Sequence, residues 1–180
     1  MSERALWMSK VPSNINPLSP TGFRLSIAKL PEIEFFCQEV NIPDITLGEV
    51  NFDTPLSRIP VPGDKLSFGN LEVQFLVDED MKNYKSVWDW MIGLGFPRNN
   101  TDYTNYMNRS NQIQQNKELT RNTTDATLAI LTNNSNQNII INFRGLFPIG
   151  LNGLTFNSTE GDVNYLIGRA TFAFNYYEFS

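Results

Sequence analysis

The sequence predicts a mainly β fold: an antiparallel two-sheet β-sandwich or barrel with one flanking α-helix and a projecting β-hairpin or arm. Three observations support this prediction. Several short segments alternate apolar and polar residues with the period of two that marks half-buried strands. A single stretch places apolar residues convincingly at helical spacing, and most connections are as short as those of hairpins. Hydrophobic residues make up 41% of the chain, which is enough for a buried core.

The N-terminal segment, residues 1–20, contains prolines at positions 12, 17 and 20 and is expected to form an irregular arm. Residues 21–180 are expected to form one domain, because a chain of 180 residues fits a single core. Alternation of apolar and polar residues predicts the first strand at 23–27 and a second strand at 34–40.

Residues 41–70 are rich in β-branched side chains, but prolines interrupt them at positions 43, 55, 60 and 62. Each proline removes a backbone N–H from the hydrogen-bonding ladder, so a central strand does not hold this many. The segment is therefore predicted to be an extended, projecting hairpin or arm. Much of its pairing is expected to come from outside the subunit.

The strand predicted at 71–77 has apolar residues at every second position, with Glu72 and Gln74 between them. A helix is predicted at about 80–92, after acids at 78–80 that supply an N-cap and suit the helix dipole. The apolar face expected for this helix consists of Met81, Tyr84, Val87, Trp88, Met91 and Ile92.

The segment at 98–125 is polar and rich in asparagine, and it is predicted to be a long loop excursion from the domain. Two strands at 126–131 and 138–143 are predicted to form a hairpin. The last strand is predicted at 169–179, where apolar side chains again occupy alternate positions.

The composition excludes the common catalytic and metal sites. The chain has no histidine, which removes Ser-His-Asp and Cys-His catalysis and most transition-metal sites. Its single cysteine, Cys37, cannot form an internal disulfide and lies in an apolar run. No glycine-rich nucleotide-binding motif occurs. We therefore predict a protein that is not an enzyme and has neither a cofactor nor a bound metal.

The net charge of -5 and the pI near 4.7 argue against a tight nucleic-acid binder, which needs basic patches to neutralise phosphate. Charged residues make up only 18% of the chain, and such a surface suits extensive contact with other protein. No apolar stretch is long enough to span a membrane, and the N-terminus does not resemble a signal peptide. Synthesis in a cytoplasm, with no membrane insertion, is expected.

The region from strand 68–77 through the acidic cap to Tyr84-Lys85-Ser86-Val87-Trp88-Asp89-Trp90 resembles the tail tube protein family of T4-like, contractile-tailed phages. The resemblance resumes at 139–148, where Gly145-Leu146-Phe147-Pro148 is similar to the family's Gly-Leu-aromatic-Pro turn after a strand. It ends with the terminal strand at 170–178 and covers most of the chain. Residues 1–20 and the excursion near 98–125 depart from the family pattern.

This resemblance implies a two-sheet β fold with a flanking helix, which type VI secretion tube proteins and tube-initiating baseplate proteins share. It implies a structural virion protein that forms stacked hexameric rings of a phage tail tube, through which DNA is ejected. The implied partners are identical copies, the sheath and the baseplate proteins, with DNA as transient cargo only. The implied location is the phage tail of the virion, after synthesis in the host cytoplasm.

Two other functions remain open at this point. A tube-like baseplate or initiator protein, or a tail terminator, would make one ring and stop, and the departures at 1–20 and near 98–125 favour such a protein. A carbohydrate-binding β-sandwich of a tail fibre is the alternative from a different class, and exposed aromatic side chains in a cleft would support it.

The polar faces of two predicted strands give the candidate residues of a tube lumen: Glu72, Gln74, Thr171 and Asn175. A neutral or acidic wall lets DNA pass, because repeated basic rings would attract phosphate at every layer. The same side chains would serve equally on a face toward solvent or toward the sheath, so both assignments stay open.

The charged residues of the predicted arm are the candidates for contacts between subunits or between rings: Glu49, Asp53, Arg58 and Lys65. Their mixed signs suit stacking contacts of opposite charge, and a solvated hairpin is the alternative. Gly145, Phe147 and Pro148 are predicted to fix a structural turn.

Overall fold

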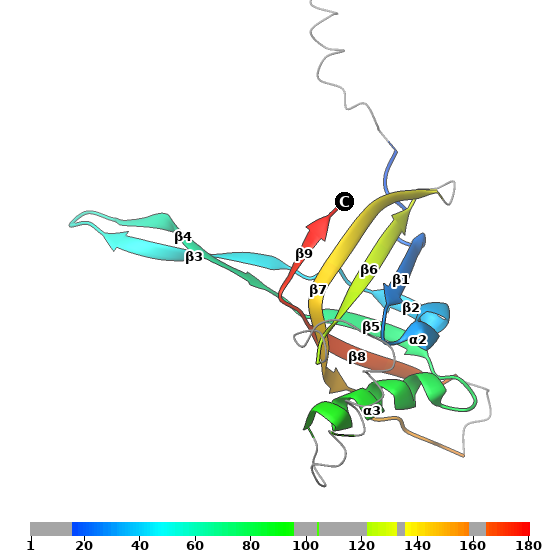
Figure 1. Ribbon diagram of the computed structural model, residues 1–180. Helices are drawn as coiled ribbons and strands as arrows, with labels where there is room; N and C mark the ends of the chain where they lie inside the picture. Colours follow the sequence, from blue (N-terminus) through cyan, green and yellow to red (C-terminus); the bar gives the residue numbers. More distant parts are fainter. Residues whose placement is uncertain (1–15, 96–103, 105–121, 133–135, 159–164) are drawn as a thin grey trace, which may run out of the picture.

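The computed structural model describes residues 16–95, 104, 122–132, 136–158 and 165–180 (Figure 1). Most of the predicted N-terminal arm and of the predicted excursion at 98–125 therefore lies outside the described residues. The helices and strands of the described part are, in chain order, β1 (Phe23–Ile27), α2 (Pro31–Phe36), β2 (Cys37–Val40), β3 (Ile45–Asp53), β4 (Arg58–Phe68), β5 (Leu71–Leu76), α3 (Lys82–Gly95), β6 (Thr124–Leu131), β7 (Gln137–Leu151), β8 (Ile167–Ala173) and β9 (Tyr176–Phe179).

An antiparallel sheet runs through the body of the protein in the order β1-β6-β7-β8-β5-β2, and β9 also pairs with β7. The first part of β7 pairs with β6 and β9, whereas its last part pairs with β8. The strand thus joins two halves of the sheet, β1-β6-β7-β9 and β7-β8-β5-β2, which run in different directions in Figure 1. The predicted mainly β, antiparallel fold with a flanking helix is confirmed.

One hydrophobic core gathers buried side chains from both halves of the sheet and from α3. In β5, Leu71, Val73 and Phe75 are buried while the residues between them are not, so the predicted alternation is confirmed. In β8, Ala170 and Phe172 are buried in the same way. The predicted last strand is divided in two, because pairing with β5 ends before the chain pairs with the first part of β7 as β9.

The predicted strand at 34–40 is only half correct, because this region begins with the short helix α2. Pro31 stands at the start of the helix, where its fixed φ and its missing N–H are tolerated. Glu32 and Glu34 lie in the first turn, where acidic side chains are favoured by the helix dipole. Strand pairing begins at Cys37, opposite Phe75 of β5.

The predicted helix is present as α3, and its predicted apolar face is correct in part, because Val87 is buried and Tyr84 and Met91 pack against the core. Trp88 was assigned to the apolar face and is 42% exposed, whereas Trp90 is only 4% exposed. Asn83, Val87 and Trp90 are buried, and their spacing defines the face that meets the core. The assignment of Trp88 was wrong because a polar residue, Asn83, begins the buried stripe and shifts it toward Trp90.

Asn83 fixes the start of α3 through hydrogen bonds that satisfy its buried side chain. Its Nδ2 donates to the carbonyl of Leu76 at 2.7 Å, and its Oδ1 accepts the backbone N–H of Asp78 at 3.3 Å. Oδ1 of Asp78 in turn accepts the backbone N–H of Asn83 at 3.2 Å. Asp78 thus caps the helix start, whereas Asp80 pairs with Lys82 at the surface.

Gly145 lies inside β7 rather than in a turn between strands. Its φ is 68°, in the left-handed region that favours glycine. The residue stands between the part of β7 that pairs with β9 and the part that pairs with β8. Phe147 and Pro148 continue β7 opposite Ala173 and Phe172. The segment predicted as a structural turn is therefore a change of direction within one long strand.

Replacing Gly145 with alanine is expected to lower the free energy of unfolding by about 1–3 kcal/mol, the usual cost of a non-glycine residue in the left-handed region. The added Cβ would also lie 2.3 Å from Nδ2 of Asn175, so that side chain would have to move. Urea unfolding followed by circular dichroism measures the change. The control is Gly153→Ala, where no atom lies within 4 Å of the added Cβ; equal losses in both variants would contradict strain at Gly145.

Candidate assembly interface

The β3–β4 hairpin projects from the body of the protein as a long two-stranded ribbon (Figure 1). All residues of β3 are exposed, and so are all residues of β4 except Gly63 and Phe68. Pro60 and Pro62 lie in β4. Each strand of a two-stranded ribbon has an open edge, so the missing backbone N–H groups of these prolines are tolerated. The hairpin predicted from residues 41–70 is therefore present as a projection.

Apolar side chains of the hairpin are exposed although they pair with one another across its strands. The cross-strand pairs are Ile45–Phe68, Leu47–Leu66, Val50–Val61 and Phe52–Ile59. Val61 is 46% exposed and Phe52 64% exposed, and the other exposed members of these pairs fall between them. Exposed apolar surface of this extent is typical of a site that binds another protein.

The root of the hairpin is fixed to the body by aromatic packing and hydrogen bonds. The ring of Phe68 lies 5.9 Å from that of Phe174 and 5.4 Å from that of Tyr177, between centroids. The hydroxyl of Tyr177 donates to the carbonyl of Pro43 at 3.3 Å. These contacts hold the direction of the ribbon while they leave its outer part exposed.

All four charged residues predicted as interface candidates lie on this hairpin and are exposed: Glu49, Asp53, Arg58 and Lys65. Asp53 and Arg58 form an ion pair at the tip, with 3.1 Å between Oδ1 and Nε. The turn beyond this pair is closed by Thr54, whose hydroxyl donates to the carbonyl of Ser57 at 2.6 Å. The tip is thus a closed turn, and the charged candidates lie along the ribbon.

The last strand, β9, has an edge that β7 does not use. Ser180 and Ile140 exchange two backbone hydrogen bonds, so pairing alternates from that point along the two strands. By this alternation, the backbone groups of Tyr177 and Phe179 point away from β7. An edge of this kind can receive a strand from another chain.

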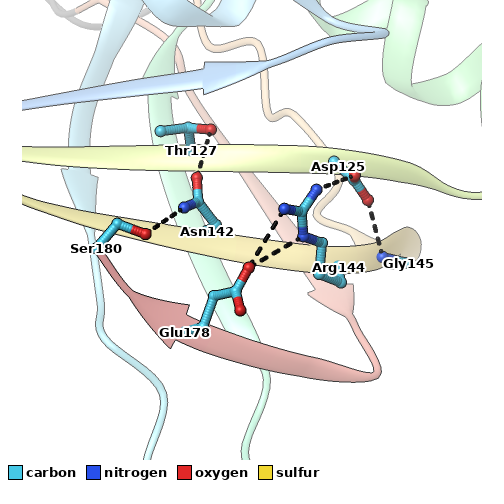
Figure 2. Close-up of polar contacts among 7 residues, drawn as sticks. All are labelled: Asp125, Thr127, Asn142, Arg144, Gly145, Glu178 and Ser180. Atoms are coloured by element: carbon cyan, nitrogen blue, oxygen red, sulfur yellow. Dashed lines mark hydrogen bonds and ion pairs between the residues drawn. The ribbon is translucent and has the colours of Figure 1, made fainter.

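A cluster of charged side chains ties β9 to its neighbours (Figure 2). Figure 2 shows the guanidinium of Arg144 between two carboxylates, with Nη1 2.7 Å from Oδ2 of Asp125 and Nη2 3.2 Å from Oε1 of Glu178. Oδ1 of Asp125 also accepts the backbone N–H of Gly145 at 3.2 Å. The hydrogen bonds that Arg144 donates, first to Asp125 and then to Glu178, raise the pKa of its guanidinium above the ordinary value. The cluster holds β6, β7 and β9 in register.

A second set of polar contacts, next to this cluster, also connects β6 and β7 to the C-terminal residue (Figure 2). The hydroxyl of Thr127 donates to Oδ1 of Asn142 at 3.2 Å, and Nδ2 of Asn142 donates to the hydroxyl of Ser180 at 3.0 Å. Sequence reasoning identified neither set of contacts. The partners lie far apart along the chain and share no motif, so no local signal marks them.

Three of the four lumen candidates lie together on the outward side of the β7-β8-β5-β2 half of the sheet. Glu72 of β5 is paired with Thr171 of β8, and Gln74 is paired with Arg169. Gln74 donates to Oε2 of Glu39 at 2.6 Å and accepts from Nε of Arg169 at 3.2 Å. The three candidates therefore share a polar face, which we call the β5–β8 face, with a cation and an acid that were not predicted there.

The β5–β8 face contains an open groove of about 430 Å³. Its lining residues come from β5, from β8 and from the end of β7 with Asn152. The fourth lumen candidate, Asn175, lies elsewhere, because it stands between β8 and β9 with its side chain against Gly145. The structure thus separates Asn175 from the other three.

Within the described residues, histidine, cysteine and acidic side chains form no group of three or more that could hold a metal ion. None of the helices in the part of the chain that was described is both long and apolar enough to cross a membrane.

Comparison with protein-family models gave no match. The chain is 27% identical over 170 residues to the tail tube terminator protein of Enterobacteria phage T4, and the match covers 91% of this chain and 89% of that protein. The tube-terminating cap of the anti-feeding prophage has a TM-score of 0.62 and 14% identity, covering 96% of each chain. A chain of the PVC sheath–tube complex, from an extracellular contractile injection system, has a TM-score of 0.59 and 15% identity, covering 100% of this chain and 98% of that one.

At these identities the two solved structures establish a common fold. The curated relative adds similarity in sequence over almost the whole of both proteins. It agrees with the resemblance carried by the segments around α3, β7 and β9. In sequence the chain is therefore similar to a phage tail tube terminator protein, and in fold it is similar to cap and sheath–tube proteins of contractile injection systems.

Proposed function

We propose that this chain is a tail tube terminator, whose copies form one ring at the end of a phage tail tube. The observation that carries the proposal is the 27% identity to a tail tube terminator protein over 91% of this chain. The fold shared with a tube-terminating cap supports the same assignment. The terminator, which was an alternative to the tube subunit on sequence grounds, thus becomes the preferred function.

The exposed surface of the subunit fits a protein that assembles with identical copies. The apolar ribbon of the hairpin and the open edge of β9 both lack partners within the described part of the chain, and neighbouring copies can supply them. A contact between two different surfaces of successive copies closes into a ring when the rotation permits. Six copies in that ring are proposed from the family resemblance.

The β5–β8 face is our proposal for the wall of the bore. The half of the sheet that carries it has four strands, so six copies would place 24 strands around the axis. Strands about 4.8 Å apart and tilted by about 40° then give a backbone diameter of about 48 Å, which is wide enough for duplex DNA. A face toward the sheath remains the alternative assignment.

The charges of the β5–β8 face suit passage rather than retention of DNA. Glu39 and Glu72 provide two carboxylates against the single guanidinium of Arg169, a balance of one negative charge per copy. A wall with this balance gives phosphate no net attraction, so DNA would be transient cargo. The sheath and the tube are the other proposed partners.

The tube subunit itself is the second candidate function. The fold similarity to a chain of a sheath–tube complex favours it. A tube subunit would stack ring on ring without limit, whereas a terminator would bind one end of a tube and stop. The two functions therefore differ in an observable product.

Negative-stain electron microscopy of the purified protein distinguishes these functions. The terminator is expected to give isolated rings whose length along the axis does not increase with protein concentration. Added to purified tail tubes, the rings are expected at one tube end only. Long tubes formed by the protein alone would favour the tube subunit, and a monomer at high concentration would contradict both functions.

A further inference from the structure

The β3–β4 hairpin leaves the body through two short connections, one before β3 and one after β4. Within the described residues, β3 and β4 pair with each other alone, so no strand ladder continues from the body into the hairpin. The connections are instead tied at one place: the backbone N–H of Gly69 donates to the carbonyl of Asp44 at 2.9 Å, and Nδ2 of Asn41 donates to the carbonyl of Asn70 at 3.1 Å. Bonds gathered at one place act as a hinge, so further contacts are needed to set the angle of the hairpin.

The contacts that set this angle come from the C-terminal end of the chain. The hydroxyl of Tyr177 in β9 donates to the carbonyl of Pro43, in the connection before β3, at 3.3 Å. The ring of the same residue lies 5.4 Å, between centroids, from that of Phe68 at the end of β4. One side chain of β9 thus contacts both connections of the hairpin, and Figure 1 shows β9 beside the point at which the hairpin leaves the body.

Strand β9 is itself held to the body along one edge, by its pairing with β7. The side chains that tie its end to β7 are at the surface: Arg144 pairs with Glu178 at 3.2 Å, and Asn142 donates to Ser180 at 3.0 Å. The side chains of the ion pair are 44% and 48% exposed, so the pair adds little stability. A short terminal strand with one paired edge belongs to the elements that open at a low cost in free energy.

We propose that β9 is a C-terminal strap that sets the direction of the β3–β4 hairpin. With the strap seated on β7, Tyr177 holds both connections, and the hairpin projects in one direction. With the strap released, the hinge bonds between the two connections remain, and the hairpin swings about them. The direction of the hairpin therefore depends on residues more than a hundred positions away in the chain. Every contact in this inference lies within one copy, so it stands independently of the proposed ring.

Energy transfer between dyes on the hairpin tip and on the body measures the direction of the hairpin. In a Cys37→Ser background, the dyes are attached at Leu56→Cys, in the exposed turn at the tip, and at Lys85→Cys, on the exposed side of α3. The donor fluorescence decay is recorded at nanomolar concentration, and fluorescence correlation verifies that monomers are observed. The otherwise unchanged chain is expected to give one narrow distribution of distances.

Two variants release the strap in different ways. Tyr177→Ala removes the contacts with the hairpin root, and deletion of residues 178–180 removes the ties to β7. Each is expected to widen the distribution of distances by a factor of about two or more. The matched control is Tyr176→Ala, which truncates the neighbouring, 48% exposed tyrosine of the same strand and is expected to leave the distribution unchanged.

A second pair of dyes reports on the body alone. Ser26→Cys and Lys85→Cys lie on exposed positions of β1 and α3, and their distance is expected to stay narrowly distributed in every variant. If Tyr177→Ala changes this body distance, Tyr177→Phe replaces it, since it keeps the ring and loses only the hydrogen bond to Pro43. This milder variant is expected to widen the tip distribution by less than the deletion does.

The outcomes decide on the strap without reference to assembly. An unchanged tip distribution after loss of residues 178–180, with the body distance intact, would overturn the inference. Equal widening by Tyr176→Ala and Tyr177→Ala would overturn it too, because the effect would then not belong to the side chain that contacts the hairpin. A protein that forms no rings would contradict the proposed function and leave the strap in place.

Discussion

Joining Gly48 directly to Gly63, which removes residues 49–62, is expected to leave a folded protein that no longer forms rings. The deletion removes the outer half of the hairpin and leaves the Leu47–Leu66 pair in place. Gly48, Gly63 and the two following residues then make a four-residue loop between the paired strands. The hydrophobic core contains none of the deleted residues, so folding of the body is expected to be unaffected.

The effect on assembly is expected to be large because the deleted half carries the exposed apolar pairs Val50–Val61 and Phe52–Ile59. Central apolar side chains of an interface contribute about 2 kcal/mol or more when truncated. Loss of even one such contribution weakens association by a factor of about 30. Size-exclusion chromatography with light scattering is expected to report a monomer at concentrations at which the full chain forms rings.

The control for this deletion changes the tip without changing the exposed apolar pairs. Leu56 is 97% exposed in the turn beyond the Asp53–Arg58 pair, so Leu56→Ser is expected to leave assembly intact. Circular dichroism and thermal unfolding of the deletion variant establish that its body is folded. Rings of normal size from a folded deletion variant would exclude the hairpin as the principal contact.

The strands of this fold could be predicted from sequence because their signal is local. Leu71, Val73 and Phe75 alternate with polar residues, and that pattern is a direct consequence of a sheet with one buried face. The projecting hairpin could be predicted for a related reason, since prolines within an apolar, β-branched segment are compatible only with an open edge.

The errors have two causes: long-range packing, and a local signal that was given too little weight. Trp88 and Trp90 are both apolar and two residues apart, and only the position of α3 against the sheet buries Trp90 and exposes Trp88. Helix α2 replaced part of a predicted strand because Pro31 and the acids after it favour a helical first turn, a local signal that was outweighed by the apolar run.

The polar face that carries the lumen candidates was predicted only in part. Glu72, Gln74 and Thr171 share this face by alternation, and the same alternation places Arg169, two residues before Thr171 in β8, on it, although this cation was overlooked. Asn175 was grouped with Thr171 as if the last strand were continuous. The chain leaves β8 before Asn175, so the alternation does not extend that far.

Truncating Phe172 to alanine is expected to lower the free energy of unfolding by about 3–5 kcal/mol, the usual loss for a buried phenylalanine. The side chain is fully buried, and its ring centroid lies 6.3 Å from that of Trp90. It stands in β8 between Leu71 of β5 and Pro148 of β7. A cavity at this point would therefore weaken the packing of α3 on β8 and on the two strands that pair with β8, β5 and β7.

The measurement requires a background in which assembly does not hide the loss, because binding to neighbouring copies stabilises the folded state. Urea unfolding is therefore compared in the variant that lacks residues 49–62, with and without Phe172→Ala. The matched control is Thr171→Ala on the outward face of the same strand, which is expected to change stability by less than about 0.5 kcal/mol. If the two substitutions shifted the urea midpoint equally, β8 would not have the buried and outward faces on which both the core and the proposed bore depend.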